Sequence, residues 1–403
     1  MAMLRLWVAV MMVGLVTVGA LGADELRRHR SSQYTILHSV DDETVREIGR
    51  HMDVVFREYA RRFSSFPVRN GGDLTLYVFQ TQEEYMAFFD EMGMNATGSG
   101  GMFFYGGEKE GLAVFIGGRP LEVVLETLRH EGLHQFAYQR VHENMPQWLN
   151  EGMAEWFGYA IETRRGLEPG VVDGGARDRV RAAIDRGVTF PLDELLFMTN
   201  AEWNARLNAQ DARAAVMYDQ SWSVVHFLVN AENGKYERLL WDYLRAVWQG
   251  LTSEQAAEKV FSRNLGPMEE AWEAYVEDLR PDPLLVAQSR LRIYALALEK
   301  LFAEGVQPES VDEMVAALME RQFEGKRTVG EEVMPISGDP ESDGGWWIGM
   351  PESLRGRAAT VRLVKDRRGK TPPRVEVRGL RQSVRLEWEA DREGELSWEV
   401  VVG

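Results

Sequence analysis

The sequence predicts an α+β protein in which three stretches differ in pattern. Residues 33–118 alternate strand-like with helix-like segments, residues 121–279 carry mostly helical periodicity, and residues 351–403 alternate apolar with charged side chains. A chain of 403 residues is long enough for two or three domains. We therefore expect a small mixed sheet with helices, then a helical subdomain, and finally a small, mainly β module.

The first stretch supplies the mixed sheet, and we assign residues 31–118 to an N-terminal α/β subdomain. Apolar and β-branched residues predict strands, and amphipathic periodicity predicts helices. The predicted strands are 34–37, 74–79, 102–105 and 112–116, and the predicted helices are 43–63 and 82–89.

The middle stretch, residues 119–280, is predicted to be a helical subdomain that ends before Pro281 and Pro283. Beyond it, residues 281–350 read as a helical hairpin followed by an irregular linker, 330–351, rich in Gly, Asp, Glu and Pro. The later helices are predicted at 221–229, 236–248, 253–261, 268–279, 284–302 and 310–323, and the strands of the last module at 359–364, 374–378, 384–388 and 396–402.

The start of the chain predicts export. A short basic region, an apolar core at 6–18 and small residues at 19–23 are typical of a signal peptide, which we assign to residues 1–22. An uncleaved anchor is the alternative, and no other segment is expected to enter a membrane. The chain has no cysteine, so it forms no disulfides. A periplasmic or extracellular protein is expected.

The charge of the chain bears on its partners. The formal net charge is −17 and the isoelectric point is about 5.0. Binding to nucleic acid needs a basic surface, so the sequence predicts no nucleic-acid partner.

A His-Glu-x-x-His pattern is the strongest chemical signal in the sequence. His130 and His134 are four residues apart, which places both imidazoles on one face of a helix and within reach of one metal ion. Pro120 suits the first turn of that helix, and apolar residues recur at helical spacing around the motif. Glu131 lies beside the histidines and is a candidate general base for a metal-activated water.

A second segment, around Glu151, supplies a candidate third ligand. A carboxylate there completes a His₂Glu site and leaves the fourth zinc position to water, as in catalytic sites. Glu155 follows one turn later on the same face, and we expect it to orient His130 through the other ring nitrogen. We therefore predict one Zn²⁺ per chain, although another divalent ion is the alternative.

The paired motifs resemble those of the gluzincin peptidases, the thermolysin and aminopeptidase-N relatives of the peptidase MA superfamily. In aminopeptidase-N relatives a similar Trp-Leu-Asn-Glu-Gly-x-Ala segment carries the third ligand, which maps onto Glu151. The acidic residue four positions after the ligand in thermolysin-like enzymes matches Glu155. The resemblance covers residues 34–279 and implies a zincin-like fold.

A third segment is similar to the Tyr-x-Lys-Gly sequence of the aminopeptidase-N family, whose tyrosine stabilises the oxyanion. That role would fall to Tyr218. Gln220 and Ser221 replace Lys and Gly, and no Gly-x-Met-Glu-Asn sequence precedes the metal helix. Action on free amino termini is therefore not predicted.

The resemblance implies a zinc metallopeptidase that acts on a peptide or protein. In gluzincins a sheet edge beside the active helix binds extended substrate, and strand 112–116 is either that edge or a core strand. A binding or scaffold protein that keeps the fold is the competing hypothesis, and a structural zinc site is a third. His226 is expected to be a packing residue rather than a site residue. The sequence predicts no oligomeric state.

Overall fold

The computed structural model describes residues 26–67, 74–141, 145–209, 213–261, 265–329, 332–353, 356–391 and 393–403. The predicted signal peptide lies outside these residues. Contacts divide the chain into two compact units. Unit 1 comprises Met1–Ala160, Gly166–Val171 and Gly175–Leu279, and unit 2 comprises Ile161–Arg165, Val172–Gly174 and Arg280–Gly403. The predicted division into five segments is finer than these units and stays a prediction.

Unit 1 opens with a five-stranded mixed sheet in the order β1-β2-β3-β5-β4. β2, β3 and β5 run parallel, whereas β1 and β4 are antiparallel to their neighbours and form the two edges. The strands are β1 (Arg27–Arg30), β2 (Tyr34–His38), β3 (Leu74–Phe79), β4 (Gly101–Phe104) and β5 (Gly111–Phe115). Strand 112–116, for which both an edge and a core position are predicted, is therefore an interior strand, and the edge on that side is β4.

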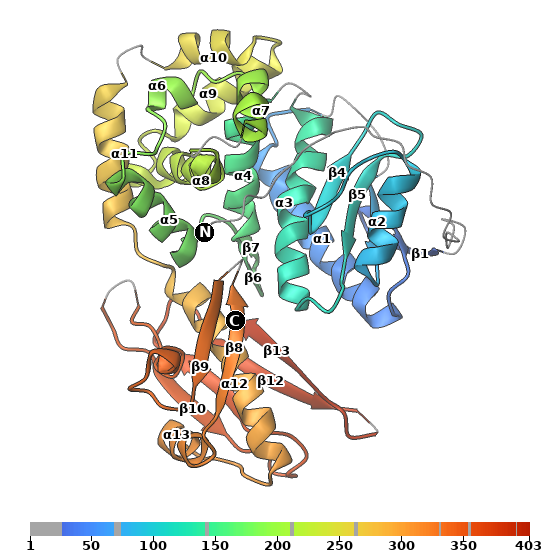
Figure 1. Cartoon of the computed structure of the whole chain (residues 1–403), viewed down its shortest axis with the longest axis vertical. Helices are drawn as coiled ribbons and strands as arrows, with labels where there is room; N and C mark the ends of the chain where they lie inside the picture. The colour runs from blue at the N-terminus through green and yellow to red at the C-terminus, as the bar shows by residue number, and fades with distance from the viewer. Residues whose placement is uncertain are drawn as a thin grey trace. The chain divides into compact units, whose positions relative to one another are not determined.

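Helices cover both faces of this sheet (Figure 1). α2 (Gln82–Glu91) buries an aromatic cluster against one face, which includes Phe79, Phe88 and Phe104. α1 (Asp42–Arg62) and α3 (Leu121–Arg140) pack against each other and against the strands on the other face. Asp41 begins α1 by accepting hydrogen bonds from the first backbone N–H groups, a common helix cap.

The rest of unit 1 is mainly helical. α4 (Gln147–Gly158) packs between α3 and α8 (Ala214–Asn230), and α9 (Glu237–Trp248) also contacts α8. The remaining helices are α5 (Gly174–Asp185), α6 (Leu192–Leu195), α7 (Asn200–Asn208), α10 (Ser253–Val260) and α11 (Gly266–Asp278). After α4 the chain also forms two short paired strands, β6 (Ile161–Thr163) and β7 (Gly166–Glu168).

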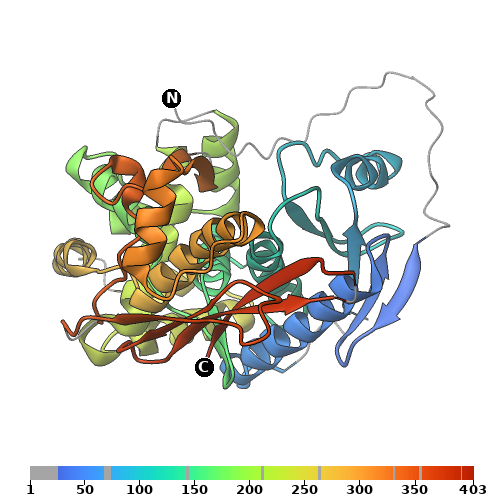
Figure 2. The same ribbon diagram turned by 90° about the horizontal axis from the view of Figure 1, so that it is seen from below.

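Unit 2 ends in a four-stranded antiparallel sheet, as the alternating pattern predicts (Figure 2). The long helix α12 (Pro283–Ala303) packs on β12 and β13 of this sheet, and α13 (Val311–Glu320) follows it. The strands are β10 (Thr360–Val364), β11 (Arg374–Arg378), β12 (Val384–Ala390) and β13 (Leu396–Val402).

The prediction of an irregular linker over 330–351 is wrong in part. A hairpin of β8 (Glu324–Val329) and β9 (Glu332–Ser337) occupies its start, and a short 3₁₀ turn at Asp343–Gly345 follows. A proline has no backbone N–H to donate to a neighbouring strand, so Pro335 disfavours a strand in the sequence. In a two-stranded hairpin both strands are edges, and an edge strand tolerates a proline.

The α+β class is thus confirmed: a mixed five-stranded sheet with helices, a helical middle that carries the two histidines, and a C-terminal antiparallel sheet. Among the described residues, no helix is both long and apolar enough to cross a membrane.

Candidate metal centre

His130, His134 and Glu151 meet at one point of unit 1. Their potential ligand atoms all lie within 4.8 Å of one another. The Nε2 atoms of the two histidines are 3.2 Å apart, and Glu151 Oε2 lies 3.3 Å from Nε2 of His130 and 3.4 Å from Nε2 of His134. Two imidazole nitrogens and one carboxylate oxygen are a donor set that suits zinc. The three residues could therefore hold a metal ion.

α3 fixes the two histidines. They are four positions apart, so both project from the same face of the helix. The opposite face is anchored on α1, where the Tyr59 hydroxyl donates a hydrogen bond to the carbonyl oxygen of Arg129. Gly132 allows this close approach, because a Cβ there would lie 3.0 Å from Met52 Cε.

α4 brings Glu151 to the histidines. Its neighbours Trp148 and Leu149 are fully buried, and the next residue, Gly152, lies against α8. A Cβ at Gly152 would lie only 2.5 Å from the backbone oxygen of Ser221, so no other residue fits at this helix crossing without a shift. The position of Glu151 therefore depends on glycine at the next position.

Each histidine also has an oxygen atom near its second ring nitrogen. Asn150 Oδ1 lies 3.0 Å from Nδ1 of His134, and Glu155 Oε1 lies 3.5 Å from Nδ1 of His130. Such contacts hold Nδ1 as the protonated nitrogen and leave the Nε2 lone pair for a metal. Glu155 lies where the sequence predicts, and its orienting role stays a prediction. Sequence reasoning assigned no role to Asn150, although it directly precedes the candidate ligand.

Glu131 lies beside the metal cluster and is held by the edge strand β4. Only 8% of its surface is exposed, and its Oε2 accepts a hydrogen bond of 3.0 Å from the backbone N–H of Phe103. Burial raises the pKa of Glu131, although the charges of His130 and His134 act in the opposite direction. A raised pKa suits a group that must both accept and return a proton near neutral pH.

The acidic groups also shift the pKa values of the histidines. Burial alone would lower the pKa of His130, but the hydrogen bond with Glu151 and the nearby carboxylates raise it to about 9. The pKa of His134 is raised for the same reasons. Burial would raise the pKa of Glu151, yet the two histidines hold it below its ordinary value. Without an ion the carboxylates thus favour protonated imidazoles, and a bound cation would displace those protons.

Tyr218 lies on α8, one turn before the Ser221 crossing with α4. Its ring packs edge-to-face on Trp203, with centroids 5.7 Å apart. Its oxyanion role stays a prediction. Gln220 points elsewhere: its side-chain amide pairs with the backbone N–H and carbonyl of Phe190. These bonds give Gln220 a structural role.

His226 is a buried packing residue. Its Nδ1 lies 2.7 Å from the Tyr275 hydroxyl and its Nε2 lies 3.0 Å from the Gly170 carbonyl. Burial lowers its pKa to about 4. The prediction that it stands outside the metal cluster agrees with these contacts.

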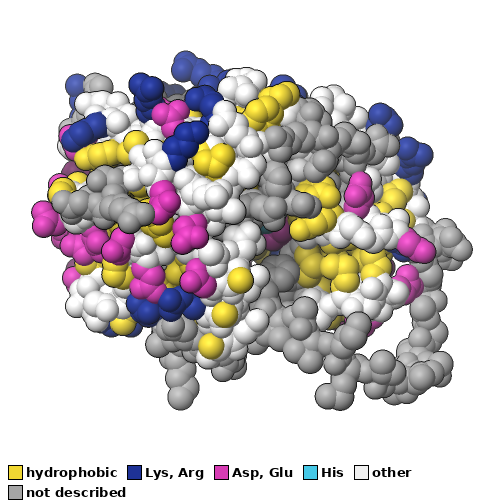
Figure 3. Space-filling model, turned by 90° about the horizontal axis from the view of Figure 1, so that it is seen from above, with side chains coloured by type: hydrophobic (Ala, Val, Ile, Leu, Met, Phe, Trp, Pro, Cys, Tyr) yellow, Lys and Arg dark blue, Asp and Glu magenta, His cyan; other side chains and the backbone are white. Residues whose placement is uncertain are grey.

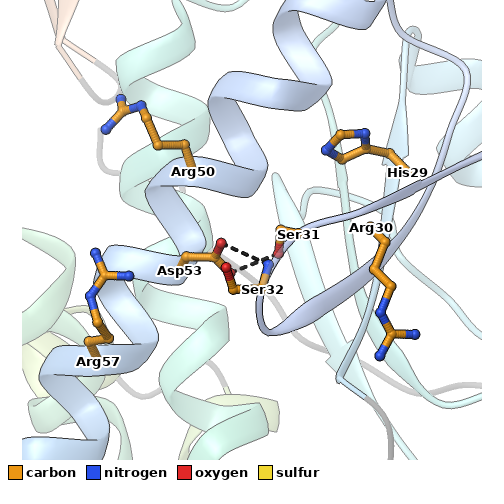
Figure 4. A pocket seen from close by; sticks show the side chains of 7 residues that line it. All are labelled: His29, Arg30, Ser31, Ser32, Arg50, Asp53 and Arg57. Carbon is orange, nitrogen blue, oxygen red and sulfur yellow. Dashed lines mark hydrogen bonds between the residues drawn. The ribbon is translucent and has the colours of Figure 1, made fainter.

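A depression lies between β1 and α1, away from the candidate ligands in sequence, and Figure 4 shows its lining side chains. Asp53 accepts hydrogen bonds from Ser31 Oγ at 2.8 Å and from the backbone N–H groups of Ser32 and Gln33, both at 2.9 Å. These bonds fasten the turn between β1 and β2 onto α1. The lining contains no predicted site residue and comprises His29, Arg30, Ser31, Ser32, Arg50, Asp53 and Arg57.

Comparison with known proteins points to one uncharacterised family. Residues 124–245 match the family described as "Protein of unknown function (DUF1570)". The matched range contains all three candidate ligands, Glu131 and α8. No curated protein matches the chain. The similarity therefore supports the helical region as a conserved type of domain without assigning it an activity.

Proposed function

We propose that this protein is an exported zinc-dependent metallopeptidase of the gluzincin type. The observation that carries the proposal is the triangle of His130, His134 and Glu151 with Glu131 beside it. Three protein ligands at one point, next to a buried carboxylate, form the arrangement expected of a catalytic rather than a structural zinc site.

The roles of the residues follow from this geometry. His130, His134 and Glu151 would hold the ion, and Zn²⁺ bound there would lower the pKa of water and polarise a substrate carbonyl. Glu131 takes a proton from the attacking water as the oxygen–carbon bond forms. It returns that proton to the amine nitrogen as the carbon–nitrogen bond breaks. The Phe103 N–H holds the Glu131 carboxylate in place during both transfers.

The same proposal extends to substrate and location. Edge strand β4 lies beside α3 and could pair with an extended peptide, which is how sheet edges capture peptide ligands. Tyr218 would donate a hydrogen bond to the developing oxyanion. The apolar start of the chain supports a periplasmic or extracellular location, and the net charge of −17 argues against a nucleic-acid substrate.

Metal analysis and hydrolysis assays with two classes of variant test this function. The purified protein should contain one zinc per chain, and His130→Ala and Glu151→Ala should lose it. Glu131→Gln should keep the zinc but hydrolyse an unfolded protein substrate at least about 100-fold more slowly. Glu126→Gln, an exposed acid one turn earlier on α3, is the matched control and should retain activity.

Two results would contradict the proposal in different ways. Absence of zinc from the wild type after zinc addition would remove the metal centre. A protein that binds zinc but is as inert as Glu131→Gln would be a zincin-like binding or scaffold protein instead.

A further inference from the structure

Three aromatic side chains form a continuous surface beside the metal centre: Phe103, Tyr105 and Tyr138. The Phe103 and Tyr105 rings stack at a centroid distance of 5.5 Å and an interplanar angle of 20°. Tyr138 lies 4.4 Å from the Tyr105 ring and 5.7 Å from the Phe103 ring, centroid to centroid. We call these three residues the aromatic surface.

Successive side chains of β4 point to opposite sides of the strand, and the aromatic surface lies on the side toward α3. Met102 and Phe104 point to the opposite side, into the core under α2. A Cβ at Gly101 would lie 2.7 Å from Thr127 Cγ2 and 3.6 Å from Glu131 Cγ, so this side of β4 faces the metal-bearing helix. Because side chains alternate along a strand, Phe103 and the following Tyr105 continue along the same side.

α3 places the aromatic surface close to the candidate ligands. Tyr138 follows His134 by four residues, so it projects from the same helix face about 6 Å further along the axis. An extended peptide advances about 3.3 Å per residue. The aromatic surface is therefore within about two substrate residues of a bond held at the metal.

Solvent can reach this surface. Tyr105 is 50% exposed, and it is one of four large hydrophobic residues that are at least 45% exposed among the described residues. Phe103 and Tyr138 are partly exposed. On the face of the molecule seen in Figure 3, hydrophobic side chains gather beside a hollow. Exposed apolar patches with a polar rim commonly mark a binding site.

The backbone of β4 can position a peptide against these rings. The Phe103 N–H points away from β5, because it donates to Glu131. In an antiparallel pair, the N–H and C=O of one residue point to the same side, so the Phe103 carbonyl also faces outward. Because the N–H is bonded to Glu131, this carbonyl is the group of Phe103 that can accept a hydrogen bond from a peptide. A peptide that pairs with this edge would have alternate side chains directed at the aromatic surface.

We propose that the aromatic surface formed by Phe103, Tyr105 and Tyr138 binds an aromatic side chain of the peptide substrate, within two residues of the bond to be cleaved. This inference rests on the proposed peptidase function for its substrate class. Tilted and stacked ring contacts favour a flat aromatic side chain over a small one, in addition to the area that it buries. Tyr105 and Tyr138 are thus residues that determine specificity rather than catalytic residues.

Peptide binding to the zinc-loaded Glu131→Gln protein tests the inference without turnover. The probes are two fluorescein-labelled heptapeptides of alanine and serine, one with a central phenylalanine and one with a central alanine. Fluorescence anisotropy should show binding of the phenylalanine peptide to be tighter by roughly tenfold or more. Adding Tyr105→Ala or Tyr138→Ala should reduce this preference to about threefold or less.

Leu296→Ala supplies the matched control, because Leu296 is 51% exposed and lies in α12 of unit 2. It should leave the preference unchanged. Equal or undetectable binding of the two peptides, or a preference that survives both tyrosine substitutions, would overturn the inference. Hydrolysis of the same peptides by the wild type is measured in parallel. A binding preference without hydrolysis would support the aromatic surface and refute the peptidase function.

Discussion

At the residue scale, the candidate ligands depend on the groups that hold their second nitrogen atoms. Asn150 and Glu155 both lie on α4, the helix that also carries Glu151. One helix therefore supplies the third ligand and an oxygen partner for each histidine. Because α4 carries all three of these residues, a small change in this helix should alter the geometry of the whole candidate metal centre.

Asn150→Ala should weaken zinc binding by about tenfold to 100-fold, because the His134 ring loses the oxygen that fixes its orientation. Competition with a chromogenic chelator measures the affinity. Asn208→Ala, an exposed asparagine at the end of α7, is the control and should not change it. Equal zinc affinity of the Asn150→Ala variant and the wild type would show that packing alone orients His134.

A second prediction at this scale concerns the dependence of stability on pH. His226 has a pKa of about 4 in the folded protein because burial disfavours its charged form, whereas an unfolded histidine titrates near pH 6.5. Between these values the unfolded state binds more protons, so the free energy of unfolding should fall as the pH drops from about 6.5 to about 4. The loss attributable to this residue is about 3 kcal/mol.

Urea unfolding at several pH values measures how steeply the free energy of unfolding changes with pH in the wild type and in His226→Gln. The variant is less stable overall, because it loses the contacts with Tyr275 and Gly170. Between about pH 6.5 and about pH 4 the free energy of unfolding of this variant should nevertheless change less steeply with pH than that of the wild type. Identical slopes would show that His226 is not the group whose protonation destabilises the fold.

At the scale of elements, the crossing of α4 and α8 fixes the position of Glu151. Gly152→Ala would place a methyl group 2.5 Å from the Ser221 carbonyl oxygen, and the helices must separate to admit it. We expect a loss of about 1–3 kcal/mol of stability together with weaker zinc binding. Chemical denaturation and chelator competition measure the two effects.

Gly158→Ala is the matched control in the same helix. Its nearest contact would be His130 Cβ at 3.8 Å, an ordinary van der Waals distance. It should change stability by less than about 1 kcal/mol. If both substitutions had equal effects, helix propensity rather than the helix crossing would explain the result.

The elements also show what the sequence could and could not predict. The spacing of His130 and His134 is a local helical property, and the four strands of unit 2 follow from local alternation, so both were predictable. Strand order depends on pairing between distant segments. The sequence therefore leaves open whether strand 112–116 is an edge or a core strand, and its position between β3 and β4 makes it interior. β1 was missed because its four residues, Arg27–Arg30, are polar and pair only as an edge.

The site itself shows the same limit. Sequence spacing predicts Glu131 near the metal, but only the three-dimensional pairing of β4 with β5 brings the Phe103 N–H to its carboxylate. The aromatic surface likewise joins residues from β4, the segment after it and α3. Such contacts between distant segments are not encoded in any single local pattern.

At the scale of the whole molecule, the metal centre is complete within unit 1. The candidate ligands and the aromatic surface belong to Met1–Ala160, and α8, which packs against α4, belongs to Gly175–Leu279 of the same unit. Unit 2 has its own core, formed by α12 and the four-stranded sheet. The division predicts that metal binding and the integrity of unit 2 are separable properties.

A chain that ends after Leu279 should therefore bind zinc with an affinity within a few-fold of the full-length protein, since every candidate ligand and supporting contact is retained. Its thermal stability should be lower, because residues 161–165 and 172–174 lose the remainder of unit 2, including the bond from the Arg164 N–H to the Val402 carbonyl. Chelator competition and circular dichroism measure the two properties, and His130→Ala in the shortened chain controls for nonspecific zinc. A shortened chain that folds with native helix content but loses zinc would show that unit 2 shapes the metal centre.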